Sequence, residues 1–213
     1  MLIKHFKKII YSIAAMTVFS VYAGPYEDFF AAIRNDNASS LSSLLERGLD
    51  PNTRDTKGQP GLTMALQERS LKTVKLLLGQ PAIDVNLLND AGESPLMMAA
   101  LKGDLSGAQA LLQRGARINQ PGWSALHYAA SGPESKLVQL LIDRGADLNA
   151  ASPNETTPLM MAAQYGSEDS VNLLLARGAD LSRRNQKGLR AVDFAKLSGR
   201  EPLFRQLEKL TPR

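Results

Sequence analysis

Cysteine is absent from this chain of 213 residues, and histidine occurs only twice. Without cysteine the chain has no disulfide, no thiolate metal ligand, no thiol nucleophile and no lipid attached through sulfur. With so few histidines, a transition-metal site would need mainly carboxylate ligands, and no group of acids shows ligand spacing. We therefore expect no metal site and no cofactor.

Aromatic residues are also scarce, at 6% of the chain with a single tryptophan. Leucine and alanine are plentiful instead, which favours packing of helices over an aromatic-rich β core. With 44% hydrophobic and 22% charged residues, the chain can bury a substantial core and is not disordered throughout. Its length suits one or two compact domains or one repeat array.

The first 23 residues show the layout of a secretory signal peptide. Three lysines precede an uncharged, mostly apolar run at 9–21, which ends in the tripeptide VYA before Gly24. A membrane span needs roughly 17–25 apolar residues, so cleavage after Ala23 is favoured over a retained anchor. We expect export to a bacterial periplasm, with release into the medium as the alternative, and no stable membrane insertion after cleavage.

The net charge of +4 overstates how basic the exported protein would be. Three of the 25 basic residues and none of the 21 acidic ones lie in the predicted signal, so 22 minus 21 leaves +1 for residues 24–213. No stripe of lysine or arginine remains, so binding to nucleic acid is not expected.

A seven-residue motif recurs along the chain with a nearly constant period. SPLMMAA at 94–100 returns as SALHYAA at 124–130 and as TPLMMAA at 157–163. Weaker copies flank these three, and the starts of the last five copies lie 34, 30, 33 and 33 residues apart. The weaker copies are EDFFAAI at 27–33, PGLTMAL at 60–66 and RAVDFAK at 190–196.

Each copy predicts one helix–turn–helix unit. Pro95 and Pro158 suit the first turn of a helix, where a missing N–H costs nothing. The Ala-Ala pair of the motif allows a close neighbour, and a second amphipathic helix follows, for example at 105–114. A left-handed glycine ends this second helix; these glycines are Gly48, Gly115, Gly145 and Gly178. The residues up to the next motif form an extended finger, in which Asp147 and Asp180 are predicted to make turns.

These motifs resemble the ankyrin repeat, whose signature is T-P-L-H-x-A-A with a period of about 33 residues. The resemblance covers roughly residues 25–210 and implies an all-α fold. The expected architecture is an ankyrin-repeat solenoid of about six helix–turn–helix repeats joined by extended, β-hairpin-like fingers. Within residues 24–213 the repeats fall roughly at 25–57, 58–91, 92–121, 122–154, 155–187 and 188–213.

The chain is similar to exported, periplasmic bacterial ankyrin-repeat proteins. Ankyrin arrays bind proteins through their fingers and inner helices and are not enzymes, so the resemblance implies a non-enzymatic scaffold for a protein partner. We expect it to be a monomer. The alternative is a secreted effector or inhibitor that acts on host or competitor proteins.

His127 occupies the fourth motif position and is the only histidine outside the predicted signal. A catalytic histidine needs a nucleophile and an orienting carboxylate, and no motif here offers them, so we expect no catalytic residue. The resemblance implies instead a structural His127 with hydrogen bonds within and between neighbouring repeats. The other copies carry different residues at this position: Phe30, Thr63, Met97, Met160 and Asp193.

Two methionine pairs, at 97–98 and 160–161, admit two interpretations. Thioethers bind copper and respond to oxidants, but these pairs align with His127 and Tyr128 in the repeat. Packing in the core is the favoured prediction, and a redox-sensing or small-ligand role is the weaker alternative.

Trp123 lies just before the motif, at a variable position that ankyrin proteins use for recognition. Its finger is short, because Ser124 comes five residues after Asn119, whereas eight residues separate the corresponding positions of the other fingers. The deletion predicts a notch in the row of fingers, with Trp123 either exposed at its edge or folded over to fill it. The predicted partner-binding set contains Trp123, Tyr165, Gln164, Tyr128, Glu93, Lys102, Gln67, Glu68, Thr156 and Leu189.

The last finger carries a small basic cluster, formed by Arg183, Arg184 and Lys187. We interpret it as a solvated loop, and contact with an acidic patch on a partner is the alternative.

Overall fold

The computed structural model describes residues 24–210, so the predicted signal peptide and the cleavage site after Ala23 lie outside the described residues. Within 24–210 the chain is all-α, as predicted: a helical segment at 24–34 is followed by eleven helices, α2 to α12. In this range β-type pairing is limited to one isolated bridge between Arg54 and Pro60. None of these helices is long and apolar enough to cross a bilayer.

The chain divides into two compact units, residues 1–83 and 84–213, which we describe separately. The described part of unit 1 begins with the helical segment at 24–34, so the divergent motif copy at 27–33 is helical, as predicted. Its other helices are α2 (Ala38–Glu46), α3 (Gly61–Gln67) and α4 (Leu71–Leu78). Its fully buried core side chains include Phe29, Ile33, Leu41, Leu62, Leu66 and Leu77.

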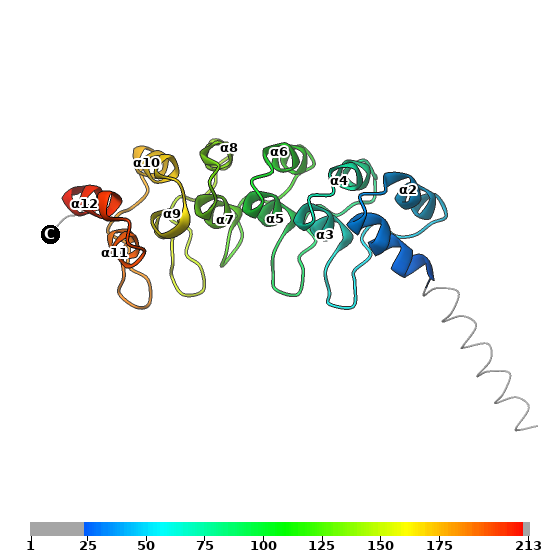
Figure 1. The fold of residues 1–213 in the computed structure, drawn as a ribbon, viewed down its shortest axis with the longest axis horizontal. Helices are drawn as coiled ribbons and strands as arrows, with labels where there is room; N and C mark the ends of the chain where they lie inside the picture. Colours follow the sequence, from blue (N-terminus) through cyan, green and yellow to red (C-terminus); the bar gives the residue numbers. More distant parts are fainter. Residues whose placement is uncertain (1–23, 211–213) are drawn as a thin grey trace, which may run out of the picture. The chain divides into compact units, whose positions relative to one another are not determined.

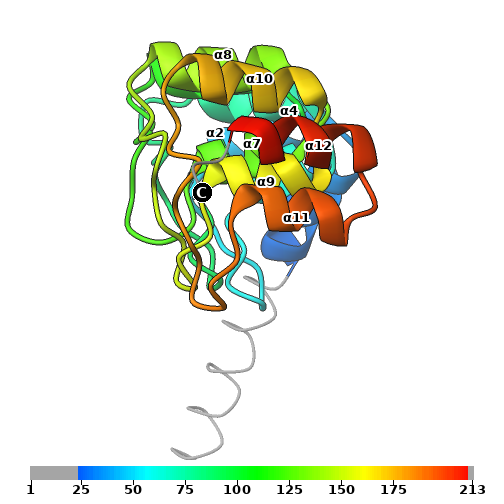
Figure 2. The ribbon, with the colours of Figure 1, turned by 90° about the vertical axis from the view of Figure 1, so that its left-hand side faces the viewer.

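Unit 2 contains four helix pairs arranged in two layers (Figures 1 and 2). The inner layer holds the helices of the repeat motif: α5 (Pro95–Leu101), α7 (Ala125–Ser131), α9 (Pro158–Tyr165) and α11 (Ala191–Leu197). The outer layer holds α6 (Leu105–Gln113), α8 (Ser135–Asp143), α10 (Glu168–Ala176) and α12 (Glu201–Leu210). Successive inner helices contact one another, and each packs on the outer helix that follows it. The motif's alanine pairs in α5, α7 and α9 are buried, which allows this close packing.

The helices begin and end at the residues that the repeat predicts. Ser94 and Thr157 accept a hydrogen bond from the backbone N–H three residues on, and Pro95 and Pro158 take the first helical position. In unit 1 α2, and in unit 2 α6, α8 and α10, are followed by glycines with φ between +85° and +91°, a conformation that strains any residue with a Cβ. These glycines are Gly48, Gly115, Gly145 and Gly178.

The fingers that follow the outer helices are loops with tight tips, and the predicted β-hairpin character is confined to those tips. In the finger before α5, the Asn89 N–H donates to the Glu93 carbonyl at 3.0 Å. The Asn89 side-chain oxygen accepts the backbone N–H groups of Ala91 and Glu93. A side chain therefore accepts the hydrogen bonds that a longer β-ladder would otherwise form.

An asparagine at the start of four of the fingers joins its repeat to the next; the last finger has Ser182 at this position. Asn119 Nδ2 donates to the Gly145 carbonyl at 2.8 Å, and the Asp147 N–H donates to Asn119 Oδ1 at 2.9 Å. The partners of Asn119 are therefore backbone groups only. Three further asparagines bond to backbone groups of the following repeat in the same manner: Asn52, Asn86 and Asn149.

The aspartates that follow these helix-ending glycines make turns, as predicted. Asp147 and Asp180 each accept the backbone N–H of the residue two positions later, at 2.9 and 2.8 Å. Hydrogen bonds from Ser182 lower the pKa of Asp180, so its carboxylate stays ionised and keeps accepting.

Candidate functional site

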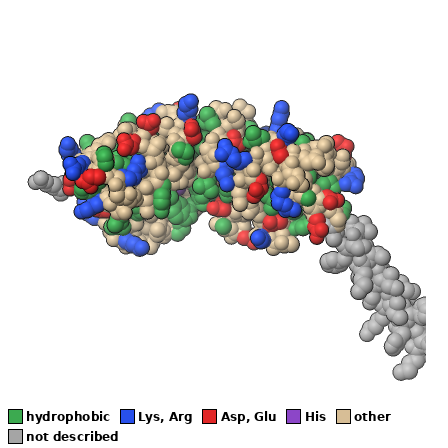
Figure 3. Space-filling model, viewed as in Figure 1, with side chains coloured by type: hydrophobic (Ala, Val, Ile, Leu, Met, Phe, Trp, Pro, Cys, Tyr) green, Lys and Arg blue, Asp and Glu red, His purple; other side chains and the backbone are tan. Residues whose placement is uncertain are grey.

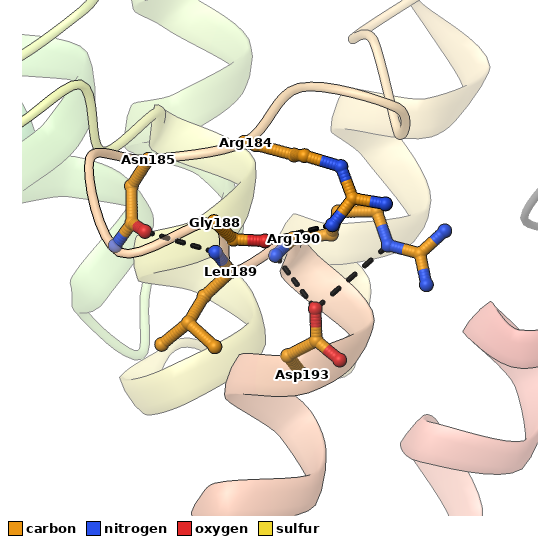
Figure 4. Close-up of polar contacts among 6 residues, drawn as sticks. All are labelled: Arg184, Asn185, Gly188, Leu189, Arg190 and Asp193. Atoms are coloured by element: carbon orange, nitrogen blue, oxygen red, sulfur yellow. Dashed lines mark hydrogen bonds and ion pairs between the residues drawn. The ribbon is translucent and has the colours of Figure 1, made fainter.

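The fourth motif position lies one turn into each inner helix of unit 2 and accepts a hydrogen bond from the backbone N–H just before the helix. In α5 the Ser94 N–H donates to Met97 Sδ at 3.4 Å, and Met160 accepts in the same way in α9. In α11 the Arg190 N–H donates to an Asp193 carboxylate oxygen at 2.8 Å (Figure 4). The sequence interpretation predicted only core packing for the methionines at this position, but in unit 2 they act as hydrogen-bond acceptors, as His127 and Asp193 do.

In α7 the acceptor is His127, whose side chain is fully buried. The Ser124 N–H donates to Nδ1 at 3.1 Å, so Nδ1 carries no proton, and Nε2 lies 2.9 Å from the Thr156 carbonyl of the next repeat. This arrangement requires the neutral tautomer with hydrogen on Nε2. Burial lowers the pKa of His127, while hydrogen bonds to backbone carbonyls and the charge of Asp147 act in the opposite direction. His127 thus bonds both within its own repeat and to the next one.

In α3 of unit 1 the fourth position is Thr63, and its buried hydroxyl has no hydrogen-bond partner among the described residues. The residue before this helix is Pro60, which has no N–H to donate. The unsatisfied hydroxyl therefore follows from the proline.

Trp123 lies half-buried at the start of α7. The centroid of its ring lies 5.2 Å from that of His127, and the two ring planes make an angle of 75°. For Tyr128 the centroid distance is 6.4 Å and the angle between the planes is 73°. These three side chains line a hollow of about 210 Å³ together with Leu101, Ser131 and Met161. Trp123 is therefore neither fully exposed nor fully buried, and it borders the hollow.

The short finger is held against its neighbour. The Gln120 side-chain amide donates to the carbonyl of Gly92, in the preceding finger, at 3.2 Å. Figure 1 shows the finger between α6 and α7 ending short of the finger between α8 and α9. In Figure 3 hydrophobic side chains gather where the fingers next to α7 and α9 descend.

Tyr128, which lines the hollow, is held by a hydrogen bond to a carboxylate. Its hydroxyl donates to Glu93 Oε1 at 2.8 Å, and the Asn89 side-chain amide donates to Oε2 at 2.8 Å. Burial, followed by the hydrogen bond to Glu93 and its negative charge, raises the pKa of Tyr128. The hydroxyl therefore remains protonated and keeps donating at neutral pH.

Large hydrophobic side chains are exposed at the C-terminal ends of three inner helices of unit 2. Leu101 is 44% exposed, Tyr165 is 63% exposed and Leu197 is 70% exposed. These three, which we call the inner-face row, are half of the six large hydrophobic side chains exposed in the described part of the chain. Leu101 and Leu197 directly follow the motif, and Tyr165 lies one position later in its repeat. On α7 the position that matches Leu101 and Leu197 carries Ser131, whose small side chain lines the hollow instead.

The remaining predicted partner-binding residues are spread over both units. Lys102, Gln164 and Leu189 are half-buried in unit 2, and Gln67 and Glu68 are exposed in unit 1. Within the described residues no ring contact joins Tyr165 to Trp123 or Tyr128, so Tyr165 stands apart from that pair.

The prediction that a partner contacts the side chain of Thr156 is wrong. Only 3% of Thr156 is exposed, so a partner does not reach its side chain. Its backbone N–H donates to Ser152 Oγ, and its carbonyl bonds to His127 of the preceding repeat.

The methionine pairs pack mainly in the core, as predicted. Met97, Met98 and Met160 are at most 4% exposed, whereas Met161 is half-buried and lines the hollow.

One basic side chain of the last finger forms a hydrogen bond within that finger. The Arg184 guanidinium donates to the Gly188 carbonyl at 2.8 Å, and the Asn185 side-chain oxygen accepts the Leu189 N–H at 3.0 Å (Figure 4). Arg184 thus closes its own finger, which favours the solvated-loop interpretation of the basic cluster.

Within residues 24–210 no three histidine or carboxylate side chains lie close enough together to hold a metal ion. The site instead combines the hollow, the inner-face row and the carboxylate of Glu93 that holds Tyr128. Such a surface suits binding to another macromolecule.

Known proteins match this chain over most of its length. The family described as "Ankyrin repeats (3 copies)" matches residues 29–121 and again 118–185. The rat ankyrin repeat and SAM domain-containing protein 6 is 38% identical over 148 residues, 69% of this chain and 13% of that protein. The human transient receptor potential cation channel subfamily A member 1 is 27% identical over 161 residues, 70% of this chain and 14% of that protein. The chain thus spans only 13–14% of the length of these curated relatives.

A solved structure is also similar. It is the complex of the predatory endopeptidase Bd0816 from Bdellovibrio bacteriovorus with immunity protein Bd3460, and the match has a TM-score of 0.75 at 26% identity. It covers 86% of this chain and 98% of the matched chain. Together with the two family matches and the repeated helix pairs, this likeness leads to one conclusion: the chain belongs to the ankyrin-repeat family.

Proposed function

We propose that this protein is a non-enzymatic scaffold that binds a protein partner through the inner helices and finger bases of unit 2. The observation that carries the proposal is the inner-face row: Leu101, Tyr165 and Leu197 are exposed on one layer of helices. Exposed apolar side chains are costly to leave in water unless a partner covers them. The hollow beside Trp123 supplies a depression on the same layer, and interfaces draw most of their binding energy from side chains seated in such depressions.

Partner capture from the cell envelope tests this proposal. The double variant Leu101→Ser plus Leu197→Ser removes exposed apolar surface without touching the core, and we expect it to lose the partners that the wild type retains. A second double variant, Trp123→Ala plus Tyr165→Ala, removes the aromatic surface. The matched control is Leu210→Ala, which truncates a side chain 56% exposed on α12. Identical partner sets for the wild type and both double variants would show that the partner does not bind through the inner face.

We further propose that the chain acts in the periplasm after loss of residues 1–23. The lysine-led apolar run and the VYA tripeptide before Gly24 support this location. Mass spectrometry of the protein purified from its source cell is expected to find Gly24 as the first residue. Fractionation then separates the periplasm from the medium, and a cytoplasmic protein that still begins at Met1 would refute export.

A second candidate function is inhibition of an endopeptidase. It is favoured by one observation, the match to the complex between an endopeptidase and an immunity protein, which covers 98% of the matched chain. Under this hypothesis the captured partner is a peptidase, and adding the scaffold at equal concentration lowers its cleavage rate. A captured peptidase that keeps its full rate would leave binding without inhibition, which is the first proposal alone.

A further inference from the structure

We infer that the hollow beside Trp123 receives an arginine side chain of the protein partner. The inference rests on the proposed protein-binding function, and it names the chemistry that the hollow selects.

Two aromatic rings form a corner at the hollow. The planes of Trp123 and Tyr128 meet at 73° with centroids 6.4 Å apart, and both rings line the hollow. A cation near ring faces is attracted by the negative charge above their π systems, and tryptophan gives the strongest attraction. The His127 ring beside them is neutral and fully buried, so it adds no repulsion.

A carboxylate without a cationic partner among the described residues is bonded to one ring of this corner, through the Tyr128 hydroxyl. Both oxygens of Glu93 accept hydrogen bonds from neutral donors, the Tyr128 hydroxyl and the Asn89 amide. In the described part of the chain no ion pair includes Glu93; the pairs present involve other acids. The half-buried negative charge is therefore held in a fixed position and uncompensated, which favours a cation as the occupant.

The shape and lining of the hollow favour arginine over lysine and over an apolar side chain. Leu101 and Met161 line the hollow with apolar atoms that suit the methylene stem of a long side chain. The guanidinium group is planar, weakly hydrated and able to stack on one ring while donating to a carboxylate. Lysine offers a compact, strongly hydrated ammonium instead, and a leucine or phenylalanine would leave the charge of Glu93 unmatched.

Trp123 is the single tryptophan of the chain, so tryptophan fluorescence reports on the hollow alone. We would titrate the purified protein with the blocked tripeptide acetyl-Gly-Arg-Gly-amide and follow the fluorescence of Trp123. The comparison peptides carry citrulline, lysine or leucine in the middle position; citrulline keeps the shape of arginine without its charge. We expect a saturable change with the arginine peptide in the millimolar range, and affinity lower by about tenfold for the citrulline peptide.

Protein variants test the carboxylate separately. Glu93→Gln keeps the side-chain shape and is expected to weaken arginine-peptide binding by about tenfold. The matched control Glu155→Gln, in the exposed tip of the finger between α8 and α9, should leave it unchanged. Raising the salt concentration should weaken binding of the arginine peptide and not that of the leucine peptide.

Several results would overturn the inference. They are a leucine or citrulline peptide that binds as tightly as the arginine peptide, a folded Glu93→Gln variant with unchanged affinity, and no response to the arginine peptide. The citrulline comparison uses the wild-type protein, so it tests whether the charge of arginine is recognised even if Glu93→Gln fails to fold. Partner capture that succeeds while the arginine peptide fails would refute this inference and leave the proposed scaffold function intact.

Discussion

The neighbouring helices α7 and α9 begin with the same motif, and in each the backbone N–H just before the helix is accepted by a different kind of atom. In α9 the buried sulfur of Met160 accepts the Thr157 N–H, and in α7 the His127 ring accepts the Ser124 N–H. Only the ring has a second polar atom, and it bonds to the Thr156 carbonyl of the next repeat. The acceptor role is therefore common to both repeats, whereas the link to the next repeat and the capacity to titrate belong to His127 alone.

The largest expected difference in stability is between variants of the glycines that follow α7 and α9. A Cβ added at Gly166, after α9, would run into the backbone carbonyl of Ala130 in α7, whereas at Gly132, after α7, the nearest atom is the Ala129 carbonyl at 3.4 Å. We expect Gly166→Ala to lower the free energy of unfolding by about 2–3 kcal/mol, as overpacking against rigid backbone does. Gly132→Ala should change it little. Urea unfolding of both variants measures the comparison, and equal losses would show that the close approach of α7 and α9 is unimportant.

Replacing His127 by the residue of its neighbours separates its two hydrogen bonds. His127→Met restores a sulfur acceptor for the Ser124 N–H but removes one of the two donors to the buried Thr156 carbonyl, which keeps its hydrogen bond from the Ser152 N–H. We expect a loss of about 1 kcal/mol in the free energy of unfolding. Met160→Leu is the matched control, because it removes only the sulfur acceptor. A His127→Met variant as stable as the wild type would mean that the bond to the next repeat contributes nothing.

The stability gap between wild type and His127→Met should depend on pH. Burial holds the pKa of His127 in the folded protein below its ordinary value of about 6.5. The unfolded chain therefore binds a proton that the folded chain resists, so stability is complete above pH 6.5 and falls as the pH drops towards the folded pKa. The slope is at most about 1.4 kcal/mol per pH unit for one group. Urea unfolding at pH 7.5 and 5.5 checks this, and a gap that stays constant would contradict it.

The smallest expected effect on stability concerns α3, in which the hydroxyl of Thr63 has no hydrogen-bond partner among the described residues. Thr63→Val in α3 removes a buried hydroxyl that has no partner, so we expect stability unchanged or raised by up to about 1 kcal/mol. Thr157→Val is the matched control, since its hydroxyl accepts the Met160 N–H and its loss should cost about 1 kcal/mol. Thermal unfolding distinguishes them, and similar losses for both variants would refute the assignment of Thr63.

The repeat itself could be predicted because each unit must satisfy the same backbone requirements. The prolines at the helix starts, the glycines after the outer helices and the turn aspartates lie where the period of about 33 residues predicts. These features depend on local conformation, which a short stretch of sequence determines.

The hollow could not be predicted, because it depends on side chains from three helices and one finger. Ser131 differs in size from its counterparts Leu101 and Leu197, which is a visible signal, but the volume that it opens depends on how Trp123 turns. Thr156 shows the converse. Its position before the motif predicts exposure, yet Thr156 is buried where its backbone bonds to Ser152 and to His127 of the preceding repeat.

The asparagines that join successive repeats bear on how such a chain grows. Asn86 and Asn119 bond to carbonyl and N–H groups of the main chain, which every amino acid carries. A duplicated copy of the 33-residue segment, inserted beside its parent, would therefore find these partners already present, with no compensating substitution. Gene duplication can lengthen the protein one segment at a time in this way, while the residues at the helix ends and finger bases diverge independently in each copy.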